Sequence, residues 1–359
     1  MQRDREVLRR KNIIYSVVLL FFVGSVYVYR NYLNVEQNSL KEGFVEIYNQ
    51  GVTMGVVQYN IKYLAEEGTD HQPAIDSLLA AFNQSLSTYV PNSEISTFNQ
   101  AGTDSITFTS SFFFPVLKES EEVYQKTNGA FDPTVMPLVN AWGFGPDGEP
   151  VLNEQSIKAI DSLLSFVGFE KLDFNNTGVS KKVKGVQLDF SAIAKGYAVD
   201  LVADLLEKRD IKNYLVEIGG EMVCSGKNAK GEFWLIGIDN PRYLEQGGEV
   251  LSAKIKIENR ALATSGNYRN YYIKDGKRYA HTISPKTGMP VQHNLLSASV
   301  FSKNCMRADA FATAFMAMGT EEAKKILDSE KDLEAILIYE EEGDLKNYIS
   351  PSLLSYIQE

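Results

Sequence analysis

The chain has 359 residues and a mass of 40.1 kDa, enough for one large domain or two small ones. Hydrophobic residues make up 44% and charged residues 23% of the sequence, which excludes a globally disordered chain. The net charge of −10 disfavours general binding to nucleic acid, because acidic surfaces repel the phosphate backbone. With only Cys224 and Cys305, the chain is neither a disulfide scaffold nor a zinc-cysteine cluster.

An apolar segment lies near the N-terminus, directly after a basic segment at residues 1–12. We expect residues 13–30 to form a transmembrane signal anchor whose basic flank stays in the cytoplasm. Residues 31–50 are then a stalk, and the body lies on the periplasmic side of the inner membrane. A cleaved signal peptide is the alternative, although no convincing small-x-small site follows the apolar run.

The body, residues 51–359, mixes strand and helix patterns. The residue spacing predicts a strand over 51–65 and then helices over 73–82, 110–126, 153–167 and 191–208. Further along the chain it predicts strands over 213–220, 232–239, 251–257 and 294–302, helices over 307–318 and 321–327, and a hairpin of 333–340 with 345–350. Strands and helices do not alternate regularly, which indicates an α+β fold in a single large body.

The segment ADAFATAFMAMG (308–319) places a carboxylate and a hydroxyl on one side of an apolar helix. Asp309 and Thr313 are four residues apart and therefore share a helix face. Such a pair suits Mg²⁺ that keeps waters and is completed by substrate phosphates. The structural alternative is that Asp309 complements the helix N-terminus and Thr313 bonds back to a carbonyl.

The segment LDFSAIAKGYAVD (188–200) passes from a strand into a helix. A helix start offers free N–H groups and a positive dipole, which suit a phosphate. Lys195 lies in the first turns, where the dipole disfavours a cation, and this placement points to an anionic partner. The alternative is a solvated lysine.

Two single residues are further candidates. His281 ends the second strand of a Tyr-rich hairpin around Asp275-Gly276, where it can contact a ligand or carry a proton; a structural histidine is the alternative. Tyr89, in a polar loop before Pro91, can stack on a base or remain a surface tyrosine.

Two irregular segments complete the set. NGAFDPTVMPLVNAWGFG (128–145) is divided by glycine and proline, and its Phe131, Trp142 and Phe144 can wall a flat ligand or pack as a loop. VEIGGE (216–221) ends a strand in two glycines, which permits close approach of another backbone.

In this order, the motifs resemble the ApbE family of FAD:protein FMN transferases over about residues 51–352. The matching segments are TMG (53–55), STYVPNSEISTFN (87–99), GAFDPTVMPLVNAWGFGP (129–146), LDFSAIAKGYAVD (188–200), YLVEIGGE (214–221), ALATSGNYRNYY (261–272), GKRYAHTISPKTGMPVQHN (276–294) and ADAFATAFMAMG (308–319). The resemblance implies Mg²⁺-dependent cleavage of FAD, transfer of FMN to a Ser or Thr hydroxyl of an acceptor protein, and release of AMP.

The resemblance also assigns residues. Its implied Mg²⁺ ligands are Asp309, Thr313 and the carbonyl of Ala192, with the backbone around Ala312 as a further contributor. Its implied flavin-binding positions are Met54, Ala130, Phe131, Asp132, Asp189, Lys195 and the backbone near Ile283, with Tyr89 stacking on adenine. Together with Asp309, the motif histidine His281 is the expected catalytic group, and we expect it to orient or deprotonate the acceptor hydroxyl.

Two departures and two alternatives accompany the resemblance. The family often has Met-Gly-Thr where this chain has Met54-Gly55-Val56, and its usual lipoprotein cysteine is absent. A pyrophosphatase that releases FMN and AMP, with water in place of the acceptor, is one alternative; a protein that only binds FAD is the other. The resemblance suggests that the acceptor is a subunit of a membrane redox complex.

Overall fold

The structure, a computed structural model, describes residues 43–146, 148, 157–243, 251–267, 271–274 and 277–358. The expected basic segment, the anchor and the stalk up to residue 42 lie outside these ranges. Within them, every helix is too short or too polar to serve as a membrane span.

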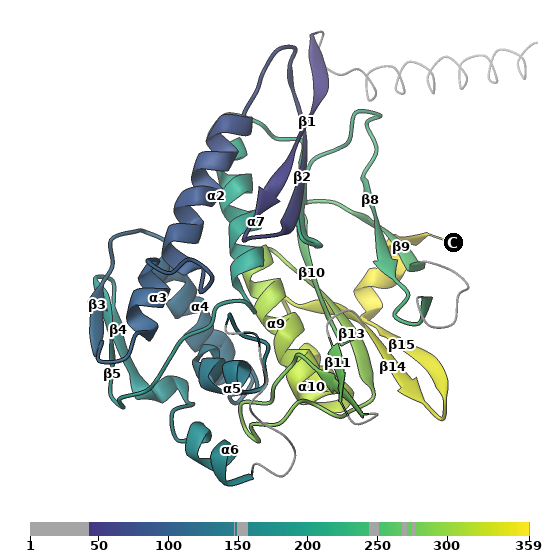
Figure 1. Cartoon of the computed structure of the whole chain (residues 1–359). Helices are drawn as coiled ribbons and strands as arrows, with labels where there is room; N and C mark the ends of the chain where they lie inside the picture. Colours follow the sequence, from purple (N-terminus) through teal and green to yellow (C-terminus); the bar gives the residue numbers. More distant parts are fainter. Residues whose placement is uncertain are drawn as a thin grey trace, which may run out of the picture.

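An eight-stranded sheet, antiparallel throughout, organises the chain, in the order β1-β2-β6-β7-β10-β13-β14-β15 (Figure 1). Its strands are β1 (Phe44–Thr53), β2 (Val57–Glu66), β6 (Tyr214–Ile218), β7 (Glu221–Ser225), β10 (Arg260–Gly266), β13 (Leu295–Ser302), β14 (Glu334–Glu341) and β15 (Asp344–Ile349). The sheet thus joins segments from both ends of the described chain.

The first hairpin corrects two expectations. The strand predicted over 51–65 is two strands, because the chain turns back at residues 54–56. Residues 44–50, assigned to the stalk, form most of β1 and pair with β2, so the folded body begins before residue 51. Both strands are rich in β-formers, so composition alone did not reveal the turn between them.

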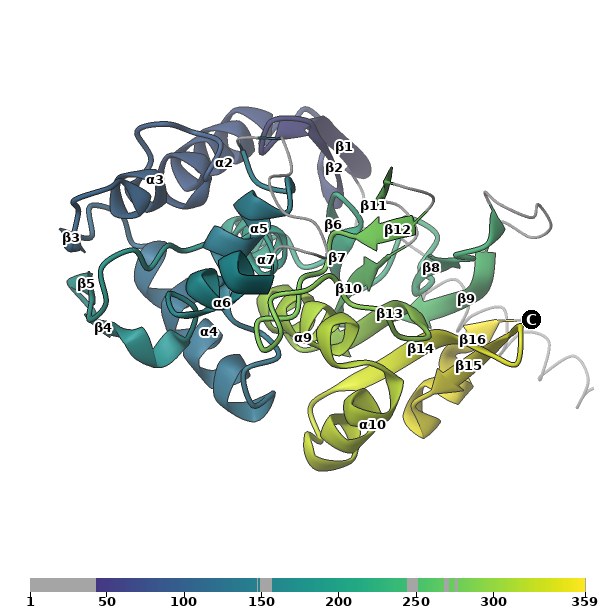
Figure 2. The same ribbon diagram turned by 60° about the horizontal axis from the view of Figure 1, so that its bottom comes forward.

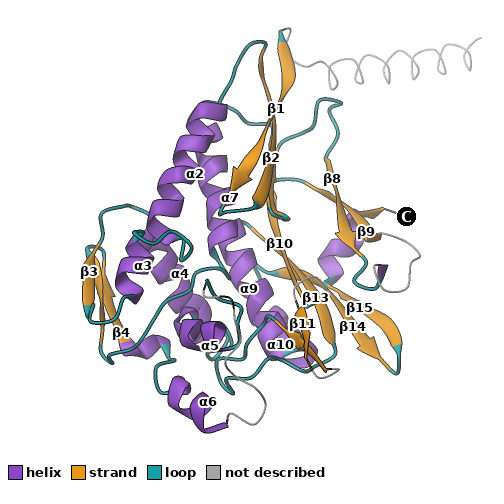
Figure 3. Ribbon diagram, in the orientation of Figure 1, coloured by secondary structure: helices purple, strands orange, loops and turns teal. Residues whose placement is uncertain are grey.

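The two faces of the sheet bury different layers. Alternate residues of β10 point to opposite faces: Ala261 and Ala263 join the core under the helices, whereas Leu262 joins a second core under β8 and β9. Figure 3 shows the α-helices on one side of the sheet, and β8 and β9 with a short helical turn beside them on the other. The helices are α2 (Gln72–Leu86), α3 (Glu94–Asn99), α4 (Phe113–Lys126), α5 (Met136–Ala141), α6 (Ile157–Leu164), α7 (Ala194–Glu207), α9 (Cys305–Met318) and α10 (Thr320–Ser329).

Smaller elements lie around this framework. In Figure 2 the sheet of β3 (Ser105–Thr107), β5 (Gly178–Lys181) and β4 (Leu172–Asn175) lies at the opposite side of the molecule from β8 (Trp234–Asp239), β9 (Leu251–Ile257) and β16 (Ile357–Gln358). The remaining elements are the hairpin β11 (Tyr271–Lys274) with β12 (Lys277–Ala280) and the 3₁₀ turns η1 (Pro133–Val135), η2 (Phe169–Lys171) and η3 (Pro351–Tyr356). The α+β expectation is confirmed, as are the helices and strands predicted from residue 213 onward, with small shifts at their ends.

Helix α9 is buried on nearly all sides, as an apolar helix in the middle of a protein must be. It crosses α7 very closely at Gly196: a Cβ built there would lie 2.2 Å from the carbonyl oxygen of Cys305 and 2.8 Å from the Cβ of Asp309. Only hydrogen fits in this space. The crossing fixes the start of α7 against the second turn of α9.

Replacing Gly196 with alanine is therefore expected to lower the free energy of unfolding by about 1–3 kcal/mol, because the helices must move apart. Urea denaturation measures the change. Asp204→Ala, on the exposed side of the same helix, is the matched control and should stay within about 0.5 kcal/mol. Equal midpoints for Gly196→Ala and the unmodified protein would contradict the close crossing.

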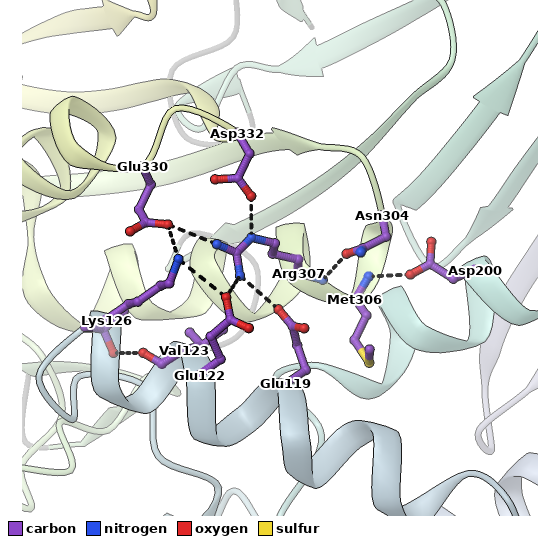
Figure 4. A network of polar contacts seen from close by, with 11 residues as sticks. Glu119, Glu122, Val123, Lys126, Asp200, Asn304, Met306, Arg307, Glu330 and Asp332 are labelled. Atoms are coloured by element: carbon purple, nitrogen blue, oxygen red, sulfur yellow. Dashed lines mark hydrogen bonds and ion pairs between the residues drawn. The ribbon is translucent and has the colours of Figure 1, made fainter.

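A charge network ties α9 to α4 and to the loop before β14 (Figure 4). The guanidinium of Arg307 is buried and bonds four carboxylates. The partners are Glu119 at 3.2 Å, Glu122 at 2.8 Å, Glu330 at 3.0 Å and Asp332 at 2.8 Å. The same helix start is capped by Asp200, whose two oxygens accept the N–H groups of residues 305 and 306.

Candidate active site

The site is built where α7 begins beside α9. The Oδ2 atom of Asp309 accepts a hydrogen bond from the Gly196 N–H, 3.0 Å away, within the first turn of α7. Asp309 is 4% exposed, and burial raises its pKa, while Lys195 and the Gly196 N–H act in the opposite direction. The structural alternative was that Asp309 complements the N-terminus of its own helix. Asp309 does complement a helix N-terminus, but it is that of α7 and not of α9.

Two oxygens of the expected metal site, the Thr313 hydroxyl and the Ala192 carbonyl, remain free of bonds to the described residues. Thr313, one turn after Asp309, makes no side-chain hydrogen bond within the described ranges, so the predicted bond back to a carbonyl is not formed. The carbonyl of Ala192 likewise accepts no bond there, since Asp309 takes the Gly196 N–H that would reach it in a longer helix. Ala312 is fully buried inside α9, where its backbone groups serve the helix.

Lys195 has an internal partner that the sequence did not reveal. Its Nζ lies 2.5 Å from Oε1 of Glu221, the first residue of β7. Burial would lower the pKa of Lys195, but Glu221 and Asp309 outweigh it and raise this pKa, so the ammonium stays charged. The placement of Lys195 predicted an anionic partner, and Glu221 of the chain itself provides at least part of that negative charge.

Glu221 is a functional candidate that the sequence motifs did not predict. It is 1% exposed, and burial raises its pKa to about 7 against the attraction of Lys195. Its Oε2 atom is buried without a hydrogen-bond partner among the described residues. One signal in the sequence was available: Glu221 directly follows the glycine pair in VEIGGE. The glycines permit another segment to approach closely at this turn, and Glu221 places a carboxylate beside it.

The glycine pair joins the first hairpin to this cluster. Gly219 adopts φ +62°, and its N–H donates to the carbonyl of Gln58 on β2. A Cβ at Gly219 would lie 2.7 Å from Val57 and 3.5 Å from the Cδ of Lys195. Met54 begins the adjacent turn with φ 47°, which side-chain-bearing residues rarely adopt. Met54 thus lies in a strained turn at the start of β2. The same end of β2 contacts Gly219, which borders the Lys195 side chain.

A second group of predicted residues surrounds the loop before α7. The N–H of Asp189 donates to the carbonyl of Pro133, and its Oδ1 accepts from both the N–H and the hydroxyl of Ser191. Burial raises the pKa of Asp189, and its charge together with burial raises the pKa of Tyr89. Tyr89 is 62% exposed, so its ring is accessible for stacking.

The segment at residues 130–132 is held rigidly. The N–H of Phe131 donates to the Thr127 hydroxyl, and Asp132 caps η1 by accepting from the N–H and hydroxyl of Thr134. Burial raises the pKa of Asp132 to about 6. Ala130 is also buried.

Two of the three aromatic rings proposed to wall a ligand are core residues. Phe131 belongs to the core under the helices. The Trp142 side chain is fully buried, with its indole N–H bonded to the Gly288 carbonyl. Because the Phe131 ring is buried, mainly its backbone groups are available to a ligand. Phe144 is the one ring of these three that remains half-exposed.

Each of the three histidines contacts a neighbouring group. The ring of His71 stacks on Tyr63 at 5.4 Å, and His293 bonds the Met316 carbonyl near the end of α9. His281 is half-buried and follows β12, and its ring packs against Phe144 in a T-shaped arrangement with the ring centroids 6.4 Å apart. Ile283, two residues on, is buried against α5 and α6 in the small core that also contains Trp142.

The geometry therefore pairs Lys195 directly with Glu221 and holds Asp309 on the N–H of the next residue, Gly196, while the charge of Asp189 acts on Tyr89. The described residues contain no group of three or more His, Cys, Asp or Glu side chains able to hold a metal ion. A cation bound here would rely on Asp309 with hydroxyl, carbonyl, water and ligand oxygens.

Comparison with known proteins decides the family. The model of the ApbE family matches residues 54–337 of this chain. The chain belongs to the ApbE family. The resemblance seen in the sequence motifs is thereby confirmed, and the match extends through the eight-stranded sheet from β2 into β14, with the edge strands β1 and β15 outside it.

Individual ApbE relatives agree with this assignment. A protein of Vibrio cholerae named FAD:protein FMN transferase is 37% identical over 318 residues, which cover 87% of this chain and 93% of the relative. One of the same name from Escherichia coli is 35% identical over 297 residues, covering 82% and 83%.

Solved structures of the family have the same fold. The flavin transferase ApbE from Vibrio cholerae matches with a TM-score of 0.78 at 37% identity, covering 87% of this chain and 99% of that one. The apo flavinyl transferase ApbE from Pseudomonas stutzeri matches with a TM-score of 0.77 at 30% identity, covering 87% and 97%.

Proposed function

We propose that this protein is an enzyme that transfers FMN from FAD to a Ser or Thr hydroxyl of an acceptor protein and releases AMP. The relatives named FAD:protein FMN transferase align with most of the chain. The observation that carries the proposal for this chain is the buried group of Asp309, Lys195 and Glu221 at the start of α7. Charged groups at a helix N-terminus suit a pyrophosphate and the cation that accompanies it.

Mg²⁺ is the cation we propose. The oxygens of Asp309, Thr313 and the Ala192 carbonyl are hard ligands, and the single carboxylate suits an ion that keeps waters and binds substrate phosphates. When bound, Mg²⁺ supplies positive charge that neutralises the phosphates as the bond between them breaks. The raised pKa of the buried Asp309 agrees with a site whose carboxylate gains from a nearby cation.

The protein residues position the reacting groups. The ammonium of Lys195, in the first turn of α7, faces the negative charge of the pyrophosphate. The acceptor oxygen forms a bond to the phosphorus of the FMN half, the bond to the AMP phosphate breaks, and AMP leaves with the bridging oxygen. His281 orients the acceptor hydroxyl and takes its proton. Asp132, Asp189 and the backbone at Met54, Ala130 and Ile283 hold the flavin.

The acceptor and the membrane belong to the same proposal. We infer that residues 13–30 anchor the protein in the inner membrane and that the body acts on the periplasmic side. An acceptor within a membrane redox complex would then lie on the same surface. Protease protection of the body in intact cells, with cleavage after opening of the outer membrane, tests this placement.

The direct test incubates the purified protein with FAD, Mg²⁺ and a candidate acceptor domain. Flavin fluorescence on the denatured acceptor together with free AMP is the expected result. AMP and free FMN with every acceptor tested would instead indicate a pyrophosphatase. Bound FAD with neither product would indicate a protein that only binds flavin.

Replacing Tyr89 with alanine is expected to raise KM for FAD by about tenfold with a smaller effect on kcat, because stacking on a base contributes about 1–3 kcal/mol. Steady-state kinetics with varied FAD measures both constants. Tyr48→Ala, which removes another exposed tyrosine from β1, is the control and should leave KM unchanged. An unchanged KM for Tyr89→Ala would remove the adenine-stacking role.

A further inference from the structure

Glu221 has a contact pattern that a purely structural carboxylate does not need. Its Oε1 atom lies 2.5 Å from Lys195 Nζ, whereas its Oε2 atom is buried without a hydrogen-bond partner among the described residues. Buried carboxylates normally have all their oxygens satisfied, because desolvation of a charge is costly. A fold that only required stability here would be served as well by an apolar pair of similar volume.

Lys195 is confined by its surroundings but not enclosed. It occupies the first turn of α7, where the helix dipole opposes a cation, and Glu221 offsets this. On another side, the Gly219 backbone borders its stem: a Cβ there would lie 3.5 Å from the Cδ of Lys195 and 3.7 Å from Oε2 of Glu221. The Lys195 side chain is nevertheless 30% exposed, so the protein does not close over it completely.

The ammonium has more donors than Glu221 uses. A lysine ammonium carries three N–H donors. One is directed to Oε1 of Glu221, the only hydrogen-bond partner of Nζ among the described residues, and two remain. A fixed ammonium with two free donors can meet two oxygens of a phosphate without first losing the rotational freedom of a long side chain.

We propose that Glu221 is a positioning residue that holds Lys195 in the orientation that meets the pyrophosphate of FAD. The inference rests on the proposed function, in which Lys195 faces the phosphates. Glu221 acts through Lys195 and does not itself touch the substrate. Its effect must therefore disappear when the lysine ammonium is absent.

A double-mutant cycle tests this dependence, with Glu221→Gln, Lys195→Met and the double variant. Glu221→Gln keeps the shape of the side chain but weakens its hold on the ammonium, and it should lower kcat by about 10²-fold, the scale of a misplaced reacting group. In the Lys195→Met background the same change should alter kcat by less than about twofold. Equal losses in both backgrounds, or full activity of Glu221→Gln, would overturn the proposal.

Two further variants separate position from charge and from stability. Glu221→Asp keeps the charge but withdraws the carboxylate by one methylene, and it should lower kcat by about tenfold; full activity would show that charge alone matters. Glu334→Gln removes the ion-pair partner of Arg260 in the same sheet. Arg260 pairs with Cys224, near the end of β7 away from Glu221, so this variant should leave kcat unchanged. Thermal melting confirms that each variant is folded.

FAD binding, measured by quenching of flavin fluorescence at equilibrium without Mg²⁺, gives a readout that does not depend on turnover. Glu221→Gln should weaken FAD binding in the unmodified background and not in Lys195→Met. If the unmodified protein forms no product with any acceptor, the proposed function fails while this comparison still decides the role of Glu221. If affinity is the same for all four proteins, the role of Glu221 fails by itself.

Discussion

Asp309→Asn is expected to lower the rate of FMN transfer by about 10²- to 10³-fold, because it removes the carboxylate proposed to hold the cation. The asparagine oxygen can still accept the Gly196 N–H, so the contact between α9 and α7 is kept. Burial already disfavours the charged carboxylate in the unliganded protein. Folding stability should therefore change little, and the loss should appear in turnover alone.

Mg²⁺ binding gives this prediction a second readout. Mg²⁺ with a non-reacting nucleotide should raise the melting temperature of the unmodified protein, because a ligand stabilises the state that binds it. Asp309→Asn should show little of this shift. The exposed Asp204→Ala variant is a control for loss of a carboxylate and should behave as the unmodified protein. A normal rate and a normal Mg²⁺ shift for Asp309→Asn would refute the assignment of the metal ligand.

The local part of this site was predictable. The helical period of 3.6 residues placed Asp309 and Thr313 on one face of α9, and the structure confirms the helix. The partner of Asp309 was not predictable from spacing, since Gly196 is 113 residues away in the chain. Only the crossing of α7 and α9, which packing of small residues permits, brings the two together.

Lys195 illustrates the same limit. Its position at the start of a helix predicted an anionic partner, which was expected to be a ligand. Glu221 is 26 residues away and reaches Lys195 because the strands β6 and β7 turn at Gly219 and Gly220. Strand pairing is a property of the fold, so the glycine pair predicted a close approach without naming which side chain would make it.

The β1–β2 hairpin was missed for a different reason. Its turn contains Gly55 but neither of the Asn-Gly or Asp-Gly pairs that usually mark a tight hairpin. The position needing φ 47° is occupied by Met54, a residue that gives no turn signal. Backbone strain of this kind is often found at functional sites, and here it occurs at the first motif of the family.

Arg307→Met is expected to have the largest effect on stability, a loss of about 3–5 kcal/mol, because it removes one partner of a buried charge network. Glu119, Glu122, Glu330 and Asp332 would then face one another with Lys126 as their remaining bonded cation (Figure 4). Urea denaturation at pH 8 measures the loss. Arg260→Met breaks a single, more exposed pair with Glu334 and should cost at most about 1 kcal/mol.

The pH dependence of the Arg307→Met loss distinguishes charge from packing. Burial already raises the pKa of Glu119 even beside Arg307. Without the guanidinium, which holds this pKa down, the folded-state pKa of Glu119 rises further above its unfolded value. The folded variant then binds more protons than its unfolded chain, so its stability relative to the unmodified protein increases as pH falls from 8 to 5. An equal loss at both pH values would mean that Arg307 contributes more through packing, including the contact of its guanidinium with the Phe311 ring, than through its pairing with the carboxylates.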